Sequence, residues 1–543
     1  MTVKRIISSV FVIGMLLAPL STYTSYAIEG NDLTDTSSTI FENTGVFYDG
    51  DAYKELNFFE GEIMSDDLDL RAITSLPSSV DLSTDPCFPP LGNQQALSSC
   101  IAFASTYYQF SYEVNKMNGV TTSSDRVIYS PKWTYNAINE GTNAGTYMTD
   151  ALTILKNYGA LKLSDLPYDS NYTWLPGNTN ISSNEMITER MEALETRLSS
   201  FGSCTLPNSG TFIYGPNDSD LYAIKALLNS GKVLSITTSP YFDYKAGTDH
   251  NGATIKINYR CTSGGGHAMV VVGYDDDAWC DVNGNGIAEN CEKGAFKLAD
   301  SYGVSGSYFD TNGYAWISYD ALNAVSANTV NSWEQNLLGT RIQAMRRETN
   351  EPTFWYMNVT HKDVYYVGEI YIDTGSNNLS NCQYYIGKSS STTTSPTYSS
   401  SSMLPVQKGA GAYKGKILFD YDYLCNPISS NYSGYDWYVN FTDLYGSYSF
   451  KVVDNLENTV SDNQVNNYLI NNKRKAVRIN TKLGDLDYDG VVEQEDAFKI
   501  LQFDAGVINL STLQHKIGDF NQSGSVTVAD YTAILQYLAN GGS

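Results

Sequence analysis

The stretch "NQQALSSCIAFAS", residues Asn93 to Ser105, places a single cysteine immediately before a run of apolar residues. From Ile101 onward the apolar residues recur at helical spacing until Gly119, which predicts a helix with Cys100 in its first turn. The partial positive charge at the start of a helix favours the thiolate, which is the nucleophilic form of cysteine. Cys100 is therefore either a nucleophile or one half of a disulfide bond.

A thiol nucleophile needs a base, and the chain has four histidines that could supply one. His361 and His515 fall in stretches with the patterns of other modules, and His250 lies in the polar loop "TDHNGAT". His267 differs, because in "GGGHAMVVVGYDDD" it follows three glycines and starts a near-continuous apolar strand. Asp300 follows another strand-like run, in "GAFKLADSYG", and is the third candidate for the same site.

Six motifs in this order resemble those of the papain-like cysteine peptidases. They match that family's mature start, nucleophile helix, cleft loop, histidine strand, Asn-Ser-Trp-Gly motif and closing strand. The motifs are "LPSSVDLS", "NQQALSSCIAFA", "GTNAG", "GGHAMVVVGYD", "ADSYG" and "NGYAWISYD", and they cover roughly residues 76 to 325. The resemblance implies an α+β, two-lobed papain-like fold over residues 76–340 and a cysteine endopeptidase that acts on protein or peptide substrates.

The resemblance also implies a role for each site residue. Cys100 would attack the scissile carbonyl, and His267 would take up the thiol proton and deliver it to the leaving amine. Gln94 would form an oxyanion hole with the backbone N–H of Cys100, where negative charge develops. Asp300 stands where the family has the asparagine that orients the imidazole, and a carboxylate should hold the imidazolium more tightly. The residues expected to line the substrate cleft are Asn143 and Gly145.

Several positions depart from the family pattern. The two cysteines that form a disulfide bond next to the nucleophile in that family are Leu97 and Thr142 here. Both partners are absent together, so the nucleophile is expected to keep a free thiol. Asp300, Ile101 and Tyr302 replace other residues at or beside the site. These replacements leave a second interpretation open, in which the chain is a catalytically impaired papain-fold component that binds or scaffolds.

The segment between the histidine strand and Asp300 contains "DVNGNGIAENCE", which matches a calcium-binding loop. Oxygen ligands alternate along such a loop because it must wrap around a hard cation. The alternative is a polar hairpin tip rich in asparagine and glycine. The expected ligands are four side chains and the carbonyl of the isoleucine, namely Asp281, Asn283, Asn285, Glu292 and Ile287.

A repeat closes the chain: "DLDYDGVVEQEDAFKILQF" begins at Asp485, and "DFNQSGSVTVADYTAILQY" begins 34 residues later at Asp519. Both halves carry oxygen side chains at the spacing of a calcium loop, a glycine at the turn, and a helical pattern after the loop. The valine and the second serine in the sets below would contribute carbonyl oxygens. The expected ligands are Asp485, Asp487, Asp489, Val491 and Asp496 in the first loop, and Asp519, Asn521, Ser523, Ser525 and Asp530 in the second.

Two such loops in register resemble a dockerin. This resemblance implies a small all-α module over residues 480–543 that folds around two calcium ions and docks onto a cohesin module of a scaffoldin, as in a cellulosome. A calcium store for the enzyme is the alternative. Contacts with the partner are expected at loop positions 10 and 11 and at two aromatic helix residues, namely Gln494, Glu495, Val528, Ala529, Phe503 and Tyr537.

The region between these modules, residues 345–475, alternates aromatic and polar residues in short runs such as "YYVGEIYIDTG" and "DWYVNFTD". This period of two, interrupted by glycine and asparagine, predicts antiparallel strands in an all-β sandwich-like module. The many aromatic residues would suit carbohydrate or protein binding, or simply the packing of a spacer.

The start of the chain is typical of an exported protein. A basic start, an apolar run from Ile6 to about Leu17 and a small-residue site ending at Ala27 predict a signal peptide over residues 1–27. Residues 28–75 would be a pro-like or linker segment, and no later stretch is long and apolar enough to span a bilayer. The excess of 59 acidic over 34 basic residues argues against nucleic acid as a partner. We therefore expect a secreted, extracellular, cellulosome-associated protein.

Overall fold

The computed structural model describes residues 75–172, 186–206, 215–238, 242–261, 266–304, 313–322, 353–378, 383–390, 397–398, 412–421, 435–442, 446–461, 474–479 and 481–542. The chain divides into two compact units, residues 1–40 and 41–543, and the first unit lies outside the described residues. The signal peptide expected over residues 1–27 and nearly all of the segment expected over 28–75 lie outside them too. Within the described residues, no helix has the length and apolar character needed to cross a membrane.

A continuous helical run begins at Cys100, as the sequence predicts. It consists of α2 (Cys100–Ala102), the π-helix η4 (Phe103–Phe110) and α3 (Ser111–Met117). Every residue of η4 is buried, so the run passes through the interior of the protein. It ends before Gly119, whose φ of 67° is a left-handed conformation that glycine adopts without steric cost. Cys100 is thus held at the first turn of a buried helix.

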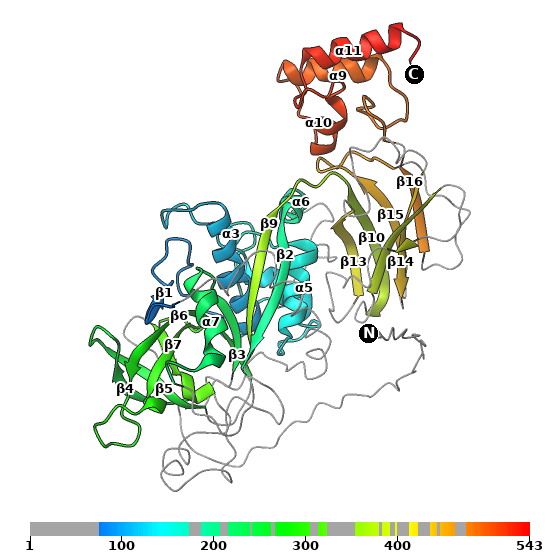
Figure 1. The fold of residues 1–543 in the computed structure, drawn as a ribbon. Coiled ribbons are helices and arrows are strands. Elements are labelled where there is room, and N and C mark those ends of the chain that lie inside the picture. Colours follow the sequence, from blue (N-terminus) through cyan, green and yellow to red (C-terminus); the bar gives the residue numbers. More distant parts are fainter. Residues whose placement is uncertain are drawn as a thin grey trace, which may run out of the picture. The chain divides into compact units, whose positions relative to one another are not determined.

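Further helices of residues 75–361, the N-terminal module, are drawn in Figure 1. Proline at the start of α4 has the fixed φ that suits a first helical position. Short turns precede or follow several strands. The helices are α4 (Pro131–Ile138), α5 (Met148–Tyr158), α6 (Ile187–Glu195) and α7 (Tyr222–Asn229), and the short turns are η5 (Ser219–Leu221), η6 (Asn290–Glu292) and η7 (Tyr319–Leu322).

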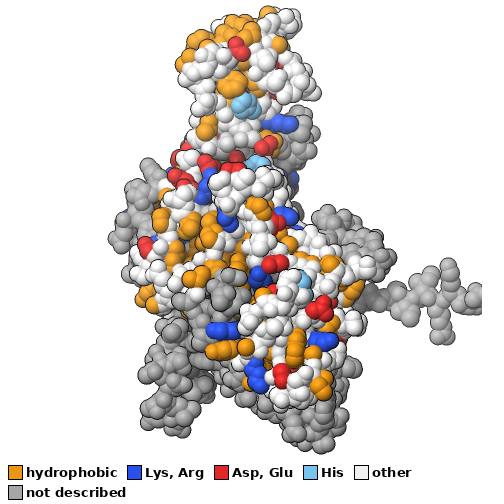
Figure 2. Space-filling view, turned by 90° about the vertical axis from the view of Figure 1, so that its left-hand side faces the viewer, with side chains coloured by type: hydrophobic (Ala, Val, Ile, Leu, Met, Phe, Trp, Pro, Cys, Tyr) orange, Lys and Arg blue, Asp and Glu red, His pale blue; other side chains and the backbone are white. Residues whose placement is uncertain are grey.

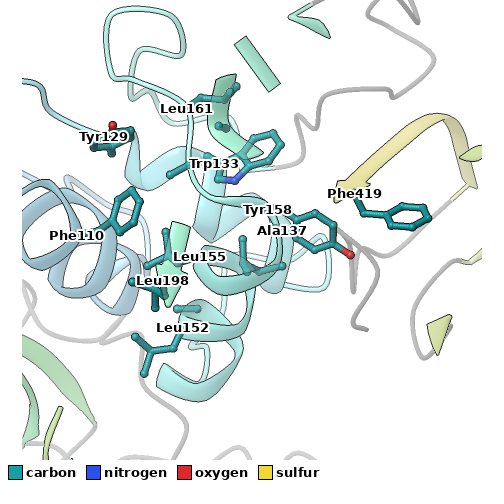
Figure 3. Close-up of a cluster of buried hydrophobic side chains, with 14 of the residues drawn as sticks. Phe110, Tyr129, Trp133, Ala137, Leu152, Leu155, Tyr158, Leu161, Leu198 and Phe419 are labelled. Carbon is teal, nitrogen blue, oxygen red and sulfur yellow. The ribbon is translucent and has the colours of Figure 1, made fainter. Parts of the chain in front are cut away.

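The core around α5 fixes the helices of this module against one another. Leu152 and Leu155 are fully buried, and Tyr158 is 2% exposed, with Phe110 of η4 in the same cluster (Figure 3). Burying a side chain of this size stabilises the folded state by about 1.5–3 kcal/mol relative to exposure. Trp133 of α4 also donates its ring N–H to the carbonyl oxygen of Gly159 at 3.0 Å, just beyond the end of α5. The helix that begins at Cys100 therefore has a rigid support.

Within the described residues, nine strands form one sheet in the order β2-β9-β3-β6-β4-β5-β8-β7, with β1 paired to β6 off this path. Strand β6 also pairs with β7, and β5 runs parallel to β8, so one end of the sheet closes on itself. Register shifts along the β6–β7 pair provide the bend. The strands are β1 (Ser79–Asp81), β2 (Thr196–Thr205), β3 (Leu234–Thr238), β4 (Phe242–Thr248), β5 (Thr254–Cys261), β6 (His267–Trp279), β7 (Lys293–Ala299), β8 (Tyr314–Ser318) and β9 (Thr353–His361).

The position of β9 differs from the expectation that residues 345–475 form a separate β module. This strand pairs with β2 from Thr196↔His361 to Thr205↔Thr353, and with β3 at Ser235↔Trp355 (Figure 1). Its residues Phe354, Trp355 and Met357 are buried at 2% exposure or less, so β9 completes the N-terminal sheet. The aromatic and polar alternation of this stretch predicts a strand, but it carries no information on which sheet the strand joins.

The remaining strands form two antiparallel sheets, in the orders β13-β10-β15 and β12-β11-β14-β16. Aromatic rings of one sheet contact those of the other, as between Tyr384 and Phe419 at 5.3 Å and between Phe441 and Tyr448 at 4.7 Å. The prediction of antiparallel strands is confirmed here. The strands are β10 (Val367–Asn378), β11 (Gln383–Ser390), β12 (Thr397–Tyr398), β13 (Ala412–Asp420), β14 (Tyr435–Thr442), β15 (Ser447–Val453) and β16 (Arg474–Ile479).

Residues 481–542, the C-terminal helical module, contain α9 (Gln494–Asp504), α10 (Thr512–Gly518) and α11 (Val528–Ala539). Its core includes Ile500 of α9 and Ile534 of α11, which occupy equivalent positions of the sequence repeat and are both fully buried. Capping boxes begin all three helices. Each repeat half therefore consists of a loop followed by a capped helix.

Candidate functional site

Cys100 carries a free thiol and is fully buried, which excludes the disulfide alternative for this residue. The preceding Ser99 does not cap the helix with its side chain. Its hydroxyl instead shares a hydrogen bond with the Tyr168 hydroxyl at 2.7 Å. Leu97, which stands where the related family has a cysteine, packs in a small cluster with Tyr135. The loop before Cys100 is therefore held by polar and apolar contacts without a cross-link at Leu97.

His267 and Asp300 form a buried pair, each 1% exposed. The Nε2 atom of His267 lies 2.7 Å from Oδ1 of Asp300, because β6 begins at His267 while β7, its neighbour, ends one residue before Asp300. The other ring nitrogen, Nδ1, is buried and has no hydrogen-bond partner among the described residues. The imidazole thus binds its carboxylate through one nitrogen and keeps the other for a reacting group.

The charge on Asp300 controls the protonation of this imidazole. Burial alone disfavours the imidazolium and lowers the pKa of His267, but the charge and hydrogen bond of Asp300, together with the nearby Cys100 side chain, raise that pKa to about 10. A positively charged ring beside a thiol favours the thiolate. The three predicted residues Cys100, His267 and Asp300 therefore meet at one site with the electrostatics of an activated nucleophile.

Two tyrosines support the histidine and the aspartate. The ring of Tyr302 stacks on the His267 imidazole, with centroids 5.1 Å apart and planes inclined by 19°. Tyr108, one helical segment beyond Cys100, donates its hydroxyl to the carbonyl oxygen of Asp300 at 2.6 Å. Sequence reasoning noted Tyr302 only as a departure from a pattern and missed Tyr108, since nothing in a buried helical run marks one tyrosine as a partner of a distant loop.

Gln94 is also buried, at 1% exposure, and its side chain is fixed at both ends. Its Nε2 donates to the carbonyl oxygen of Leu97 at 2.7 Å, and its Oε1 accepts a hydrogen bond from the hydroxyl of Ser301. The backbone N–H of Gln94 also donates to the carbonyl oxygen of Ser301 at 2.6 Å. An amide nitrogen has two hydrogens, so one N–H remains for an oxyanion. Ser301, which orients this amide beside Asp300, was missed in the sequence.

The two residues expected in the cleft, Asn143 and Gly145, lie in the loop before α5. Asn143 bonds to backbone groups of Ala96 and Ser98, so this loop packs against the segment between Gln94 and Cys100. Gly145 is half-buried in the same loop. The structure therefore brings the predicted cleft loop beside the predicted site.

The loop from Asp281 to Glu292 has the hydrogen bonds of a wrapped loop. Asp281 accepts N–H groups of Gly284, Asn285 and Gly286 at 2.6, 3.1 and 2.9 Å. Glu292, 1% exposed, accepts the N–H of Val282 at 2.7 Å. The carboxylates of Asp281 and Glu292 thus accept backbone N–H groups from within the loop, while Asn283 and Asn285 are exposed.

Glu289 adds a carboxylate to this loop that sequence reasoning missed. Its Oε1 accepts from the amides of Asn283 and Asn285 at 3.3 and 2.6 Å, and its Oε2 is buried without a hydrogen-bond partner in the described part of the chain. Burial, with the neighbouring Glu289, raises the pKa of Glu292 to about 7. The expected ligands follow one another at every second residue from Asp281, and continuing this spacing beyond Ile287 leads to Glu289. Ile287 is 62% exposed at the tip.

The first C-terminal loop gathers three carboxylates. Asp485, Asp487 and Asp489 each offer an oxygen within 4.8 Å of the others. Asp485 is fully buried, and its Oδ1 has no hydrogen-bond partner within the described residues. Burial, followed by the charges of Asp496, Asp487 and Asp489, raises the pKa of Asp485 to about 7. A divalent cation would relieve both the repulsion and the unpaired oxygen.

The three loops share one hydrogen-bond pattern. In each, the glycine at the turn donates its N–H to the first aspartate, and the residue three before the last acidic ligand donates its N–H to that ligand. The loop of the N-terminal module and the two loops of the C-terminal repeat thus wrap in the same way. The first bonds are Gly286 to Asp281 (2.9 Å), Gly490 to Asp485 (2.9 Å) and Gly524 to Asp519 (2.8 Å). The second are Glu289 to Glu292 (3.3 Å), Glu493 to Asp496 (2.9 Å) and Thr527 to Asp530 (2.9 Å).

Other predicted ligands of these loops are exposed at the surface. Asn521 and Ser523 of the second loop lie close to their acidic partners through backbone N–H groups, at 3.0 Å to Asp530 and 2.8 Å to Asp519. Ser523 also donates its hydroxyl to the carbonyl oxygen of Ser525 at 3.2 Å. Val491 is 44% exposed.

The residues predicted to contact a partner are mostly on the surface of the C-terminal helical module. Gln494, Glu495 and Ala529 are exposed, and Val528 and Tyr537 are 43% and 38% exposed. Phe503 is only half-buried and rests edge-on against His515, with centroids 4.8 Å apart. Phe498 is 56% exposed on α9 and was missed as a candidate partner contact. Its position off the buried helical face that carries Ile500 could have indicated this exposure. Figure 2 shows hydrophobic side chains gathered on this module.

Comparisons with known proteins find similar solved structures but no matching family. No family model and no curated protein matches the chain. Among solved structures, xylellain, a cysteine protease from Xylella fastidiosa, is 17% identical with a TM-score of 0.33, covering 54% of this chain and 93% of that one. The digestive procathepsin L2 of Tenebrio molitor is 18% identical (TM-score 0.31, 46% and 64% covered), and procathepsin B S9 of Trypanosoma congolense is 16% identical (TM-score 0.31, 51% and 80% covered). Likenesses this distant do not assign a family, so the chemistry rests on the site's own geometry.

Proposed function

We propose that the chain is a secreted papain-like cysteine endopeptidase that is anchored through a C-terminal dockerin to a cohesin-bearing scaffoldin. The observation that carries the peptidase proposal is the buried His267–Asp300 pair, 2.7 Å apart, beside the free thiol of Cys100 at a helix start. The ordered sequence motifs around these residues support the papain-like fold. Protein or peptide substrates follow from the chemistry of acyl transfer.

In this mechanism the Cys100 thiolate attacks the scissile carbonyl carbon, and a C–S bond forms as the carbonyl π electrons move to oxygen. The resulting oxyanion accepts hydrogen bonds from the Cys100 backbone N–H and from the unused N–H of Gln94. His267, held by Asp300, donates its proton to the leaving amine as the C–N bond breaks. His267 then accepts a proton from water, whose oxygen attacks the thioester and releases the acid product and the thiolate.

The decisive experiment is labelling of the full-length protein with a thiol-reactive peptide epoxide, followed by mapping of the adduct. The proposal predicts modification at Cys100 that is abolished by His267→Ala. Cys87 is an internal control, because it is also a free buried thiol whose pKa is raised to about 11 by burial and Asp85. Labelling of Cys100 no faster than that of Cys87, or labelling unaffected by His267→Ala, would contradict the peptidase proposal.

The second candidate is a catalytically impaired papain-fold component that binds or scaffolds. It is favoured by the complete burial of Cys100, since a nucleophile must be reached by its substrate. The same labelling experiment separates the two, because an impaired site would leave Cys100 unmodified in the folded protein. Ile101 lies beside the proposed nucleophile and is fully buried, so its side chain affects the site through packing.

Calcium is the proposed cofactor of three loops. The two C-terminal loops would hold one ion each, through the residue sets beginning at Asp485 and Asp519, and the loop from Asp281 to Glu292 would hold a third. The unpaired buried oxygen of Asp485 and the shared hydrogen-bond pattern support this fit. Bound calcium would neutralise the gathered carboxylates and fix the loops, and cohesin binding would depend on the helices that the loops support.

The two-sheet module of residues 367–479 is proposed to be a β-sandwich that spaces or binds. Its rings Tyr384, Tyr421 and Trp437 are fully buried, so within the described residues these aromatic side chains build the core. Carbohydrate binding by this module therefore stays a lesser proposal than packing. Glycan binding by the isolated two-sheet module would favour the binding role, and its absence would favour packing.

A further inference from the structure

The side-chain amide of Asn143 holds two consecutive peptide groups of the loop before Cys100. Its Oδ1 accepts the backbone N–H of Ser98 at 2.8 Å, and its Nδ2 donates to the carbonyl oxygen of Ala96 at 3.1 Å. The orientation of the amide follows from its partners, because only oxygen can accept an N–H and only nitrogen can donate to a carbonyl. Asn143 therefore grips the peptide groups on either side of Leu97.

The opposite ends of the same two peptide groups are held by Gln94. The carbonyl oxygen of Leu97, which shares a peptide group with the Ser98 N–H, accepts from Gln94 Nε2 at 2.7 Å. The N–H of Leu97, which shares a peptide group with the Ala96 carbonyl, donates to the backbone oxygen of Gln94 at 3.2 Å. A peptide group is planar and rigid, so fixing its N–H fixes the direction of its carbonyl. Each group thus links Asn143 to Gln94.

Asn143 is itself held in place from the helical side. The hydroxyl of Tyr135, a fully buried residue of α4, donates to Asn143 Oδ1 at 2.9 Å and lies 3.2 Å from the carbonyl oxygen of Ala144. In the described part of the chain, no hydrogen bond joins Asn143 to Cys100 or His267. Any influence of Asn143 on the reacting groups therefore passes through the loop that it grips.

We infer that Asn143 is a positioning residue that aims the free N–H of Gln94 at the oxyanion through the two peptide groups of Leu97. This inference rests on the proposed peptidase function, in which Gln94 supplies an oxyanion donor. Hydrogen bonds in a connected chain strengthen one another, so the Tyr135–Asn143–peptide–Gln94 series holds its last member more firmly than one bond would. An oxyanion donor depends on such preorganisation, because its value lies in being aimed before charge develops.

The test is a double-mutant cycle on peptide hydrolysis with Gln94→Ala and Asn143→Ala in the full-length chain. Loss of an oxyanion donor lowers kcat by roughly 10²- to 10³-fold, and Asn143→Ala is expected to lower kcat by about 10-fold or more with little change in KM. If Asn143 acts through Gln94, the double variant hydrolyses within about 3-fold of Gln94→Ala alone. Two effects that multiply overturn the inference.

Alkylation of Cys100 by iodoacetamide separates positioning from a general loss of structure, because this reaction forms no oxyanion. Asn143→Ala is expected to be alkylated at the wild-type rate, and a loss of alkylation in proportion to kcat overturns the inference. Thr142→Ala, at the exposed residue just before Asn143, is the matched control. It should retain wild-type kcat, because the Thr142 hydroxyl donates to the carbonyl oxygen of Asn139 and not to the segment that Asn143 holds. A wild-type chain that neither hydrolyses peptides nor labels at Cys100 overturns the proposed function and this inference together, whereas an active wild type with multiplying effects overturns the inference alone.

Discussion

At the level of single residues, Asp300 gives the site its charge balance. One oxygen, Oδ1, accepts both the His267 ring N–H at 2.7 Å and the Ser301 backbone N–H at 2.5 Å. The other, Oδ2, is buried without a hydrogen-bond partner among the described residues. A buried carboxylate with one bare oxygen is costly unless it faces a cation, so the folded state favours His267 in its charged form.

Replacing this carboxylate by the neutral amide, Asp300→Asn, should move the alkaline limb of the pH–activity profile to lower pH. The His267 pKa is raised to about 10 with the Asp300 charge present, and removing one charge shifts a neighbouring pKa by about 1 to 3 units. Since His267 must be protonated to release the amine, the alkaline decline of kcat/KM should then begin at a lower pH. The measurement is kcat/KM for one peptide from pH 5 to 11.

The control for this prediction is Asp275→Asn. Asp275 binds the exposed His250 at 2.8 Å. The substitution Asp275→Asn therefore removes an equivalent charge beside another histidine and should leave the pH–activity profile unchanged. An alkaline limb that stays in place in Asp300→Asn would contradict the assignment of His267 as the acid.

The His267–Asp300 pair also stabilises the folded state. Because the pKa of His267 is raised above 6.5 in the folded state, this stabilisation is complete below pH 6.5 and is lost as the pH rises towards 10.

Single residues of the site differ in how well the sequence reveals them. Cys100, His267 and Asp300 each stand at a border between small or polar residues and an apolar run, and such borders can be read from one chain. Ser301 and Tyr108 act through bonds that span 207 and 192 residues. No local pattern encodes such pairs, and the bracketing role of Asn143 depends on the peptide geometry of a folded loop.

At the level of elements, the end of α5 depends on a glycine. Gly159 has a φ of 64°, and a Cβ atom at this position would meet the carbonyl oxygen of Ala193 at 2.0 Å and that of Thr196 at 2.5 Å. Gly159→Ala should therefore lower the free energy of unfolding by about 3 to 5 kcal/mol through overpacking and backbone strain. Gly119→Ala is the control, because φ is 67° and nothing lies within 4 Å, so only about 1 to 2 kcal/mol of strain is expected. Urea denaturation measures both, and equal losses would contradict the packing described at Gly159.

The three wrapped loops should bind calcium independently of one another. Isothermal titration of the wild-type chain should count three calcium ions, and Asp485→Ala or Asp281→Ala should each remove one. The first substitution should also lower the helix content of residues 481–542, since calcium at hundredfold excess over Kd stabilises a site by about 2.7 kcal/mol. Asp504→Ala, an exposed acidic residue at the end of α9 and outside the loops, should change neither quantity. An unchanged ion count in Asp485→Ala would refute the calcium role of that loop.

Elements are more predictable than their partners. The helix from Cys100, the strand from His267 and the helices after each C-terminal loop follow from periodicity and caps, and the structure contains all of them. The destination of β9 could not be read, because an aromatic strand suits any half-covered sheet edge. The hydrogen bonds to β2 and β3, made far from it in sequence, decide where it goes.

At the level of the whole molecule, the position of β9 makes residues 353–361 part of the N-terminal sheet. A chain ending at residue 340 lacks this strand and leaves the edges of β2 and β3 unpaired, and unpaired edges promote aggregation. We expect that chain to appear in the insoluble fraction or as large species in size-exclusion chromatography. A chain ending after His361 is the control. Both chains lose the packing of Met191 and Leu194 against Leu418, so more soluble protein in the longer chain reports on β9 alone. A monomeric chain ending at residue 340 with the same urea midpoint would contradict the role of β9.

The hydrogen bond between Gln94 and Ser301 also has a consequence for biosynthesis. It joins positions 207 residues apart, so the proposed nucleophile is synthesised long before the strands that bring its base and its oxyanion donor into place. Contacts of such wide separation form late, because the intervening chain must lose its freedom first. A growing chain therefore carries the Cys100 thiol before the hydrogen bond between Gln94 and Ser301 can form. Under the proposed peptidase function, hydrolysis would begin only after β6 and β7 have paired.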